Sequence, residues 1–229
     1  KGWQTADEYL SGNVRQKLRT AQRVAARDPF FAGNVDALIA AQPKDLEASE
    51  IEVRLGATWL DKKYIEQFMY ETFETPRYLR GQIEISYVPY TAEWQVSRKS
   101  MVRYNDVAAF TTYGTDRASA YRLLEDALNL RDIRIYDTIE DADGRERRVL
   151  NAKETTLAAQ KQQLIRDAFK DWIWKDPERR ETLVRQYNEE MNSTRPREYD
   201  GSHIVFSGMN PEITLREHQK NAIAHVLYG

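Results

Sequence analysis

The sequence predicts a mixed α+β protein that is mostly helical, with a small antiparallel or mixed sheet in the middle and a helical hairpin toward the C-terminus. Two patterns predict this class. Over most of the chain, apolar residues recur at spacings of three and four, which is typical of amphipathic helices. Between residues 76 and 150 they alternate with polar residues, as in half-buried strands. With 229 residues, the chain can form one large domain or two small ones with a buried core.

Residues 1–75 form the first predicted segment, a helical region. Thr5 and Glu8 have the spacing of a capping box, so we expect a helix to begin there and to run to about residue 27, unless Gly12-Asn13 splits it. Further helices are predicted over residues 34–41, 45–53 and 61–73. Trp59, Tyr64 and Phe68 could form a stacking platform for bases, but aromatic residues at helical spacing are more often part of a core.

Residues 76–150 form a small α+β module with two predicted hairpins and one helix between them. The first hairpin comprises residues 83–87 and 94–98, and Thr115 or Asp116 is expected to cap the helix that follows. The second hairpin joins strands at Ile133–Ile135 and Val149 through the sequence Asp141-Ala142-Asp143-Gly144. That sequence lacks the further oxygen ligands of a calcium loop, which favours a simple hairpin turn.

Residues 151–194 are expected to form a helical hairpin, with a long helix over residues 152–175. Asp176 as N-cap and Pro177 at the first helical position predict the start of the second helix. Residues 195–229 then form a linker and one more helix, which Thr214 is expected to cap. Its residues at helical spacing are Leu215, His218, Gln219, Ala222, Ile223 and Val226. In the linker, Ser207-Gly208-Met209-Asn210-Pro211 predicts a turn.

Composition excludes several classes of protein. The formal net charge of −2 argues against a generic coat for nucleic acid, and the absence of cysteine removes disulfides and thiolate chemistry. A reducing cytoplasm is therefore the expected location. No apolar run is long enough for a membrane span, and residues 1–10 lack the apolar core of a signal peptide. Because the chain does not begin with Met and ends abruptly, we expect it to be a fragment of a longer protein.

The C-terminal residues carry a motif of known type. The pattern Leu-x-x-(His/Tyr)-Gln-x-x-Ala, read here as Leu215, His218, Gln219 and Ala222, resembles the start of the ATPase core in Swi/Snf-type helicases of superfamily two. The wider run YDGSH-x-x-F-x-GMNP-x-I-x-LR-x-HQ-x-NAIAH-x-LYG resembles one branch of that family. That branch comprises large helicase-methylase proteins of bacterial phages, plasmids and conjugative elements, which are often called DNA methylases.

The resemblance implies that the chain lies just upstream of the phosphate loop of a DNA-dependent ATPase. In that role Gln219 would bond the adenine edge, Arg216 would bond phosphate or acidic neighbours, and Phe206 would pack on the base. The sequence contains no G-x-x-x-x-G-K-[ST] loop, so catalytic residues and a cofactor are not expected in this chain. A metal site is not expected either, because His218 and His225 are too far apart to share one ion without a third partner and no H-E-x-x-H pattern is present. ATP and Mg²⁺ would belong to the parent protein, as would any methyltransferase activity.

Two roles follow for this chain. In the first, it is an accessory region that contributes DNA contact or domain coupling. The candidate phosphate contacts are Arg195 and Arg197, held by the rigid Pro196, and Arg15, Arg19 and Arg23 on the first predicted helix. In the second role, it is a protein-interaction module that couples the adjacent methylase and helicase domains without binding DNA itself. The near-neutral charge leans toward the second role.

Overall fold

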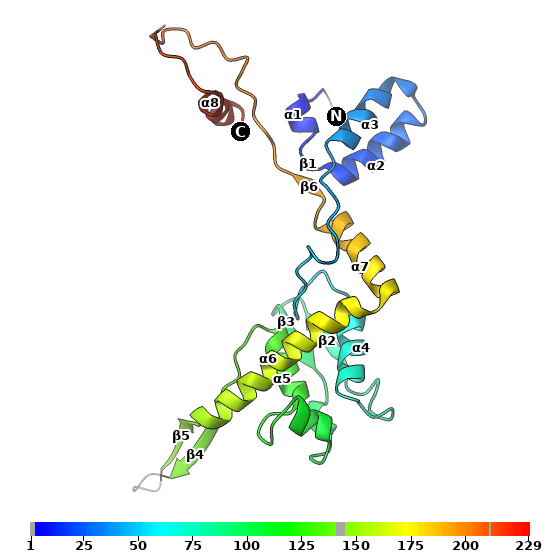
Figure 1. Cartoon of the computed structure of the whole chain (residues 1–229), viewed down its shortest axis with the longest axis vertical. Coiled ribbons are helices and arrows are strands. Elements are labelled where there is room, and N and C mark those ends of the chain that lie inside the picture. Colours follow the sequence, from blue (N-terminus) through cyan, green and yellow to red (C-terminus); the bar gives the residue numbers. More distant parts are fainter. Residues whose placement is uncertain (1–2, 141–144, 211) are drawn as a thin grey trace. The chain divides into compact units, whose positions relative to one another are not determined.

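The computed structural model describes residues 3–140, 145–210 and 212–229 (Figure 1). It confirms the α+β class. Helices predominate, and the strands of this described part form three two-stranded antiparallel sheets instead of one. The chain divides into a central unit, Ala48–Leu183, and a terminal unit that combines Lys1–Glu47 with Val184–Gly229. None of the helices in the described ranges has the length and apolar character needed to span a bilayer.

The terminal unit begins with a broken helix. The chain forms α1 (Ala6–Tyr9) and α2 (Val14–Ala25), and between them Gly12, at φ 68°, lies in the short strand β1 (Gly12–Asn13). Strand β1 pairs with β6 (Thr194–Arg195), so the predicted split at Gly12-Asn13 is confirmed. The predicted capping box was wrong, because the Thr5 side chain makes no capping hydrogen bond. Instead, the Asn13 side chain accepts from the Gln16 amide and caps α2.

The remaining N-terminal elements of this unit form a small core. A 3₁₀ turn, η1 (Pro29–Phe31), leads into α3 (Ala32–Ala40), which packs on α2. Val14, Ala21 and Leu38 are buried between these helices, and Leu18 and Val35 pack against them. The unit also contains the C-terminal helix α8 (Glu217–Tyr228).

The helix predicted over residues 45–53 is absent. In the central unit, Ile51, Val53 and Leu55 are buried, whereas the intervening Glu52 and Arg54 are exposed. This period of two belongs to extended chain. Sequence periodicity over so short a segment could not separate the two conformations, and burial of alternate side chains decided the outcome.

The central unit contains the predicted module, residues 76–150. Strands β2 (Ile85–Val88) and β3 (Glu93–Val96) form the first hairpin, and β4 (Tyr136–Glu140) and β5 (Glu146–Leu150) form the second. Its helices are α4 (Lys62–Thr72), α5 (Ala120–Leu128), α6 (Ala152–Lys175) and α7 (Pro177–Glu190), the last of which ends in the terminal unit. Two short turns, η2 (Lys99–Met101) and the π-helical η3 (Ala108–Thr112), connect β3 to α5.

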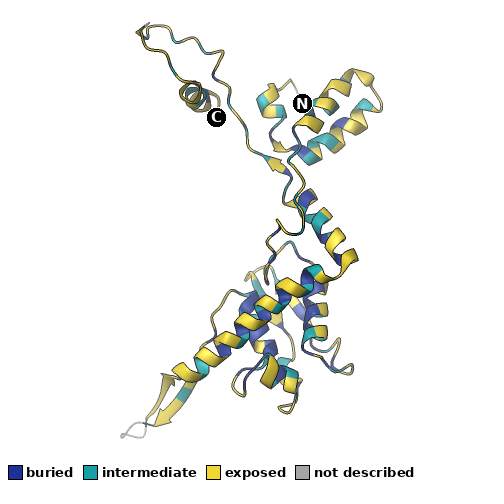
Figure 2. Ribbon diagram, in the orientation of Figure 1, coloured by how far each residue is buried: buried dark blue, intermediate teal, exposed yellow. Residues whose placement is uncertain are grey.

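Aromatic rings fill the core of the central unit. Phe68 and Phe169 meet edge to face with centroids 5.1 Å apart, and Phe73 meets Tyr121 at 5.3 Å. All four side chains are fully buried, so Phe68 is core and not a platform for bases (Figure 2 shows the buried stripe along α6). The hydroxyl groups of Tyr121 and Thr75 are hydrogen-bonded at 2.7 Å, which satisfies both inside this core.

The start of a helix was predicted correctly where a capping side chain bonds the backbone of that helix. Asp176 accepts from the Arg179 amide at 2.7 Å and Pro177 opens α7, as predicted. The predicted cap at Thr115 or Asp116 was wrong, because α5 begins only at Ala120. Thr115 Oγ1 instead accepts from the amides of a turn that precedes the helix. The predicted turn over residues 141–144 lies outside the described residues.

Candidate functional site

Helix α8, which carries the motif residues His218, Gln219 and Ala222, packs against the extended segment that precedes it. Three pairs of residues join them: Tyr199 with His225, Gly201 with Asn221, and His203 with Tyr228. The rings of the first pair stack with centroids 4.6 Å apart, and in the second pair the amide donates to the side-chain oxygen at 2.8 Å. The three helix residues are four and three positions apart and form one face of α8, here called the inner face.

Gly201 makes this packing possible because its backbone touches the helix. The residue is buried, and a Cβ added to it would lie 2.0 Å from the carbonyl oxygen of Lys220. No real side chain can approach a backbone atom so closely. Residues 199–203 (YDGSH) therefore pack directly against α8, and Gly201 is required because only a residue without a Cβ fits so close to the helix backbone.

The opposite face of α8, here called the outer face, carries Gln219, Ala222, Ile223 and Val226. They are four of the six residues that the sequence places at helical spacing, and they share one side of the helix. Leu215 precedes the helix. Val226 is 86% exposed, Gln219 and Ala222 are also exposed, and Ile223 is half-buried. The apolar stripe of this helix is thus exposed to solvent, whereas the more polar inner face packs against residues 199–203.

The structure links two of the three predicted nucleotide-binding residues. Gln219 Oε1 accepts from the backbone amide of Arg216 at 2.9 Å, which fixes the start of α8. Arg216 is the N-cap of the helix and not part of it, and Thr214 is not the cap. Phe206 is half-buried in the linker, and no hydrogen bond joins it to Gln219 in the described part of the chain.

Arg197 connects this C-terminal assembly to α1. Its Nε and Nη2 atoms both lie 2.8 Å from Asp7 Oδ2, its Nη1 donates to the Tyr228 carbonyl oxygen, and its guanidinium lies 4.7 Å from the centre of the Tyr199 ring. Hydrogen bonds from Thr5 and then Arg197 hold the pKa of Asp7 below its ordinary value, and Asp7 raises the pKa of Arg197. In this conformation Arg197 therefore has a structural role, joining α1 to the last turn of α8.

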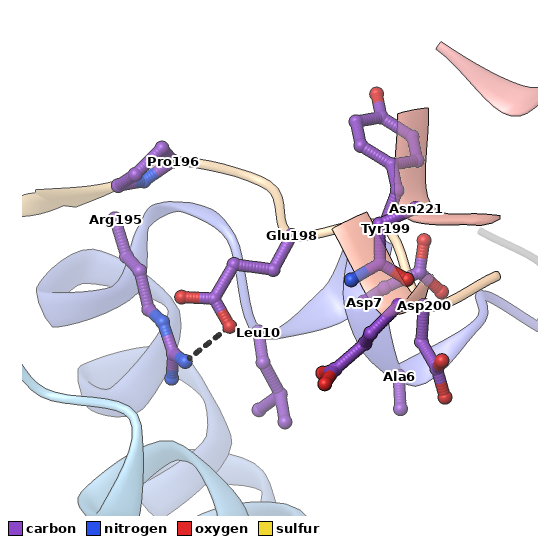
Figure 3. Close-up of a pocket in the computed structure, with 10 residues that line it drawn as sticks. Ala6, Asp7, Leu10, Arg195, Pro196, Glu198, Tyr199, Asp200 and Asn221 are labelled. Atoms are coloured by element: carbon purple, nitrogen blue, oxygen red, sulfur yellow. Dashed lines mark hydrogen bonds and ion pairs between the residues drawn. The ribbon is translucent and has the colours of Figure 1, made fainter. Parts of the chain in front are cut away.

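A cavity of about 370 Å³ opens between α1, residues 195–200 and the start of α8 (Figure 3). Its charged lining residues are the carboxylates of Asp7, Glu198, Asp200 and Glu217 together with Arg195. Arg195 lies 3.2 Å from Glu198, and Ser202 donates twice to Asp200, which lowers the pKa of that carboxyl group. Because acidic groups outnumber the single guanidinium, the cavity does not suit the phosphates of a nucleotide.

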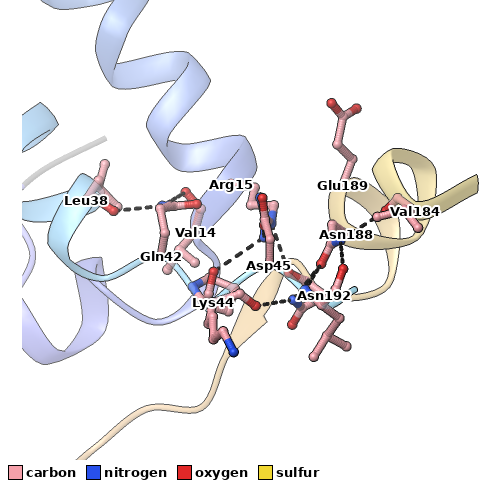
Figure 4. Close-up of polar contacts among 12 residues, drawn as sticks. Val14, Arg15, Leu38, Gln42, Lys44, Asp45, Val184, Asn188, Glu189 and Asn192 are labelled. Carbon is pink, nitrogen blue, oxygen red and sulfur yellow. Dashed lines mark hydrogen bonds and ion pairs between the residues drawn. The ribbon is translucent and has the colours of Figure 1, made fainter. Parts of the chain in front are cut away.

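The other predicted DNA-binding arginines also have partners in the terminal unit. Arg15 Nη2 lies 2.5 Å from Asp45, and its Nε donates to the Asn192 carbonyl oxygen at 2.9 Å (Figure 4). Arg19 pairs with Glu189 at 3.0 Å on the surface. Arg23 bonds only the Arg19 carbonyl and the Thr20 hydroxyl in the described residues, and it is the one of the five without an acidic partner there.

Sequence reasoning missed the acidic partners that occupy these arginines. Asp7, Asp45 and Glu189 are distant in sequence from the cations they bind, and no local pattern marks them. It also assigned no role to Tyr199 or Gly201, although both stand in the quoted run. Their spacing from α8 in sequence gave no sign that they pack against it.

Comparison with known proteins places the larger part of the chain in a family. A model described as Domain of unknown function (DUF8437) matches residues 54–193. The chain belongs to this family. The matched range covers most of the central unit and ends before Arg195 and α8. No curated protein and no solved structure matches the chain.

Proposed function

We propose that the chain is a non-catalytic accessory region of a DNA-dependent ATPase or helicase linked to DNA methylation, which contributes DNA contact and couples domains through α8. The outer face of α8 carries this proposal. Its inner face is fixed by three pairs of contacts, so the outer face presents Gln219 and an apolar stripe in a defined orientation. An exposed apolar stripe on an ordered helix is typical of a surface that another domain covers.

Gln219 is suited to the role that the resemblance implies. Its oxygen is held by the Arg216 amide, which leaves the two donors of its amide nitrogen for an acceptor on a base. The acidic cavity beside α8 is unsuited to phosphates, so an adjacent motor domain would bind the triphosphate and Mg²⁺. The chain would then contribute a contact to the adenine edge and no catalytic group.

The test is DNA-stimulated ATP hydrolysis by the protein expressed in its full native reading frame. We expect Gln219→Ala to raise the KM for ATP while kcat changes less, because a base contact contributes to binding in both ground and transition states. Gln163→Ala, on the exposed surface of α6, is the matched control and should behave as wild type. Absence of ATPase activity, or equal KM values for the two variants, would remove the motor-linked role.

A second candidate function is favoured by the ion pairs of the terminal unit. Arg15, Arg19, Arg195 and Arg197 each face a carboxylate, so contact with phosphate would require these pairs to break. In this role the chain couples methylase and helicase domains without binding DNA.

Duplex binding at several salt concentrations separates the two roles. If Arg195 and Arg197 contact phosphate, replacing both with Ala reduces the salt dependence of the affinity by about two contacts. If the chain only couples domains, duplex binding is absent or is the same in the double variant.

A further inference from the structure

The loop between β3 and α5, residues 97–119, presents an exposed aromatic ring in a fixed position. Tyr104 is 73% exposed, yet its hydroxyl donates to the Asp116 carbonyl oxygen at 2.5 Å. One face of its ring stacks on Phe110, with centroids 4.7 Å apart and planes 16° from parallel. Because the hydroxyl and one ring face are already held, the other face can bind a ligand with little further loss of side-chain entropy.

The backbone beneath this ring is held in an unusual conformation. Phe110 lies in η3, a single π-helical turn closed by the Tyr113 amide bonding to the Ala108 carbonyl at 3.0 Å. Lys161 of α6 donates to the Thr111 and Thr112 carbonyl oxygens at 2.7 and 3.0 Å, which satisfies the end of that turn. Short π-helical segments occur frequently at functional sites.

Two further observations show that the loop is tightly held. A Cβ on Gly114 would lie 2.0 Å from the Ala109 carbonyl oxygen, so the chain after η3 passes directly against it. Arg98 has the left-handed backbone angle φ 46°, and the neighbouring Lys99 forms an ion pair with Glu125 of α5. An arginine rarely adopts that backbone conformation, and such strained positions cluster at binding and catalytic sites.

Exposed polar residues of the same loop indicate what the ring can bind. Arg98 and Arg103 are exposed, and neither has a carboxylate partner within residues 3–140, 145–210 and 212–229. Asn105, next to Tyr104, is also exposed and offers an amide donor and acceptor. Arg103 is the sequence neighbour of Tyr104 and Arg98 lies in the same loop, and guanidinium groups suit the phosphates that flank a base.

From this arrangement we infer that Tyr104 is a stacking platform for a base of single-stranded nucleic acid, with Arg98 and Arg103 contacting its backbone. Aromatic stacking combined with nearby cations is how proteins bind single strands with little sequence preference. The site lies within residues 54–193, the range shared with the family, and α8 takes no part in it. Binding of a single strand at this site does not depend on ATP hydrolysis, so its test is independent of the test of the proposed function.

The experiment uses the complete chain and measures fluorescence anisotropy of labelled oligothymidine and oligouridine, each about 15 nucleotides long, at low salt. We expect binding that weakens as salt rises. We expect Tyr104→Ala to weaken binding roughly five- to a hundred-fold, the range for loss of one stacked base. Tyr104→Phe should weaken it much less, because the ring and its stacking on Phe110 remain and only the hydroxyl bond to Asp116 is lost. Comparing the two oligonucleotides tells whether DNA or RNA is the preferred strand.

Tyr90→Ala is the matched control, because Tyr90 is 98% exposed in the same unit. Its affinity should equal that of wild type. Failure of the wild-type chain to bind either oligonucleotide would overturn the inference, and so would equal affinities for Tyr104→Ala and Tyr90→Ala. A duplex bound as tightly as the single strands would also overturn it, since a paired base cannot stack on the ring. If Tyr104→Ala does not fold, Arg103→Glu tests the site through its phosphate contact and must also weaken binding.

Discussion

Arg197 and Asp7 are 190 positions apart in sequence, and two nitrogen atoms of the Arg197 guanidinium lie 2.8 Å from one oxygen of the Asp7 carboxylate. The same arginine reaches the last turn of α8 through the Tyr228 carbonyl oxygen. One side chain thus joins the first helix of the chain to its last. Because the pair is accessible to solvent, its effect is expected in the local order of α8 more than in global stability.

The Asp7 carboxylate should make the order of α8 depend on pH. Its pKa is lowered in the folded state, so its contribution is present above the ordinary value of 3.8 and is lost as pH falls through the lowered pKa. Hydrogen exchange, corrected for the intrinsic effect of pH, should show α8 amides losing protection in this acidic range. Asp7→Asn should lack that step. An unchanged step in Asp7→Asn would assign it to another group, such as Asp200, whose pKa is also lowered.

Gly201→Ala should detach α8 from residues 199–203. The new methyl group would need the space of the Lys220 carbonyl, which is backbone and cannot rotate away. Limited proteolysis should cleave the chain beyond residue 195 faster in this variant. Gly33→Ala is the matched control, because nothing lies within 4 Å of its added Cβ and it lies inside α3, where Ala is favoured. Equal cleavage rates in both variants would contradict the close packing.

Asn188→Ala should destabilise the terminal unit by about 1–3 kcal/mol. This side chain is buried; its Oδ1 accepts from the Leu46 amide at 2.8 Å, and its Nδ2 donates to the Leu46 carbonyl at 2.9 Å (Figure 4). Truncation would leave both backbone groups without a partner. Urea denaturation measures the change, and Asn34→Ala, on the exposed side of α3, should be neutral or slightly stabilising.

Tyr121→Phe should remove a loss of stability at alkaline pH. Burial raises the pKa of Tyr121 to about 12 from an ordinary 10, so the folded state resists ionisation that the unfolded state allows. Its stabilising contribution is therefore complete below pH 10 and declines between pH 10 and about 12. The decline should be roughly 2 kcal/mol in wild type and absent in Tyr121→Phe. A decline of the same size in both proteins would assign it to other tyrosines.

At neutral pH the same substitution has a separate effect. It leaves the buried Thr75 hydroxyl without the oxygen that it meets at 2.7 Å, and the expected cost is about 1 kcal/mol. Tyr90→Phe, at a residue that is 98% exposed, should change neither the stability at neutral pH nor its alkaline decline.

The sequence by itself determined the elements whose signals are local. The long helix α6 was predicted with its observed bounds, and Asp176 with Pro177 marked the start of α7, because a capping side chain acts on its own backbone neighbours. The first hairpin and α4 followed from period and turn residues in the same way. The motif on α8 likewise predicted a helix with one defined stripe, although not where the helix begins.

Only the tertiary structure decided what those elements face. It left the stripe of Gln219 and Val226 open and packed the opposite face of α8 on Gly201. It also paired arginines with carboxylates far away in sequence, as in Arg197 with Asp7, and exposed one ring of the stacked pair Tyr104 and Phe110. A helical period specifies that side chains share a face. Which face is buried depends on contacts between segments distant in sequence, which no local pattern encodes.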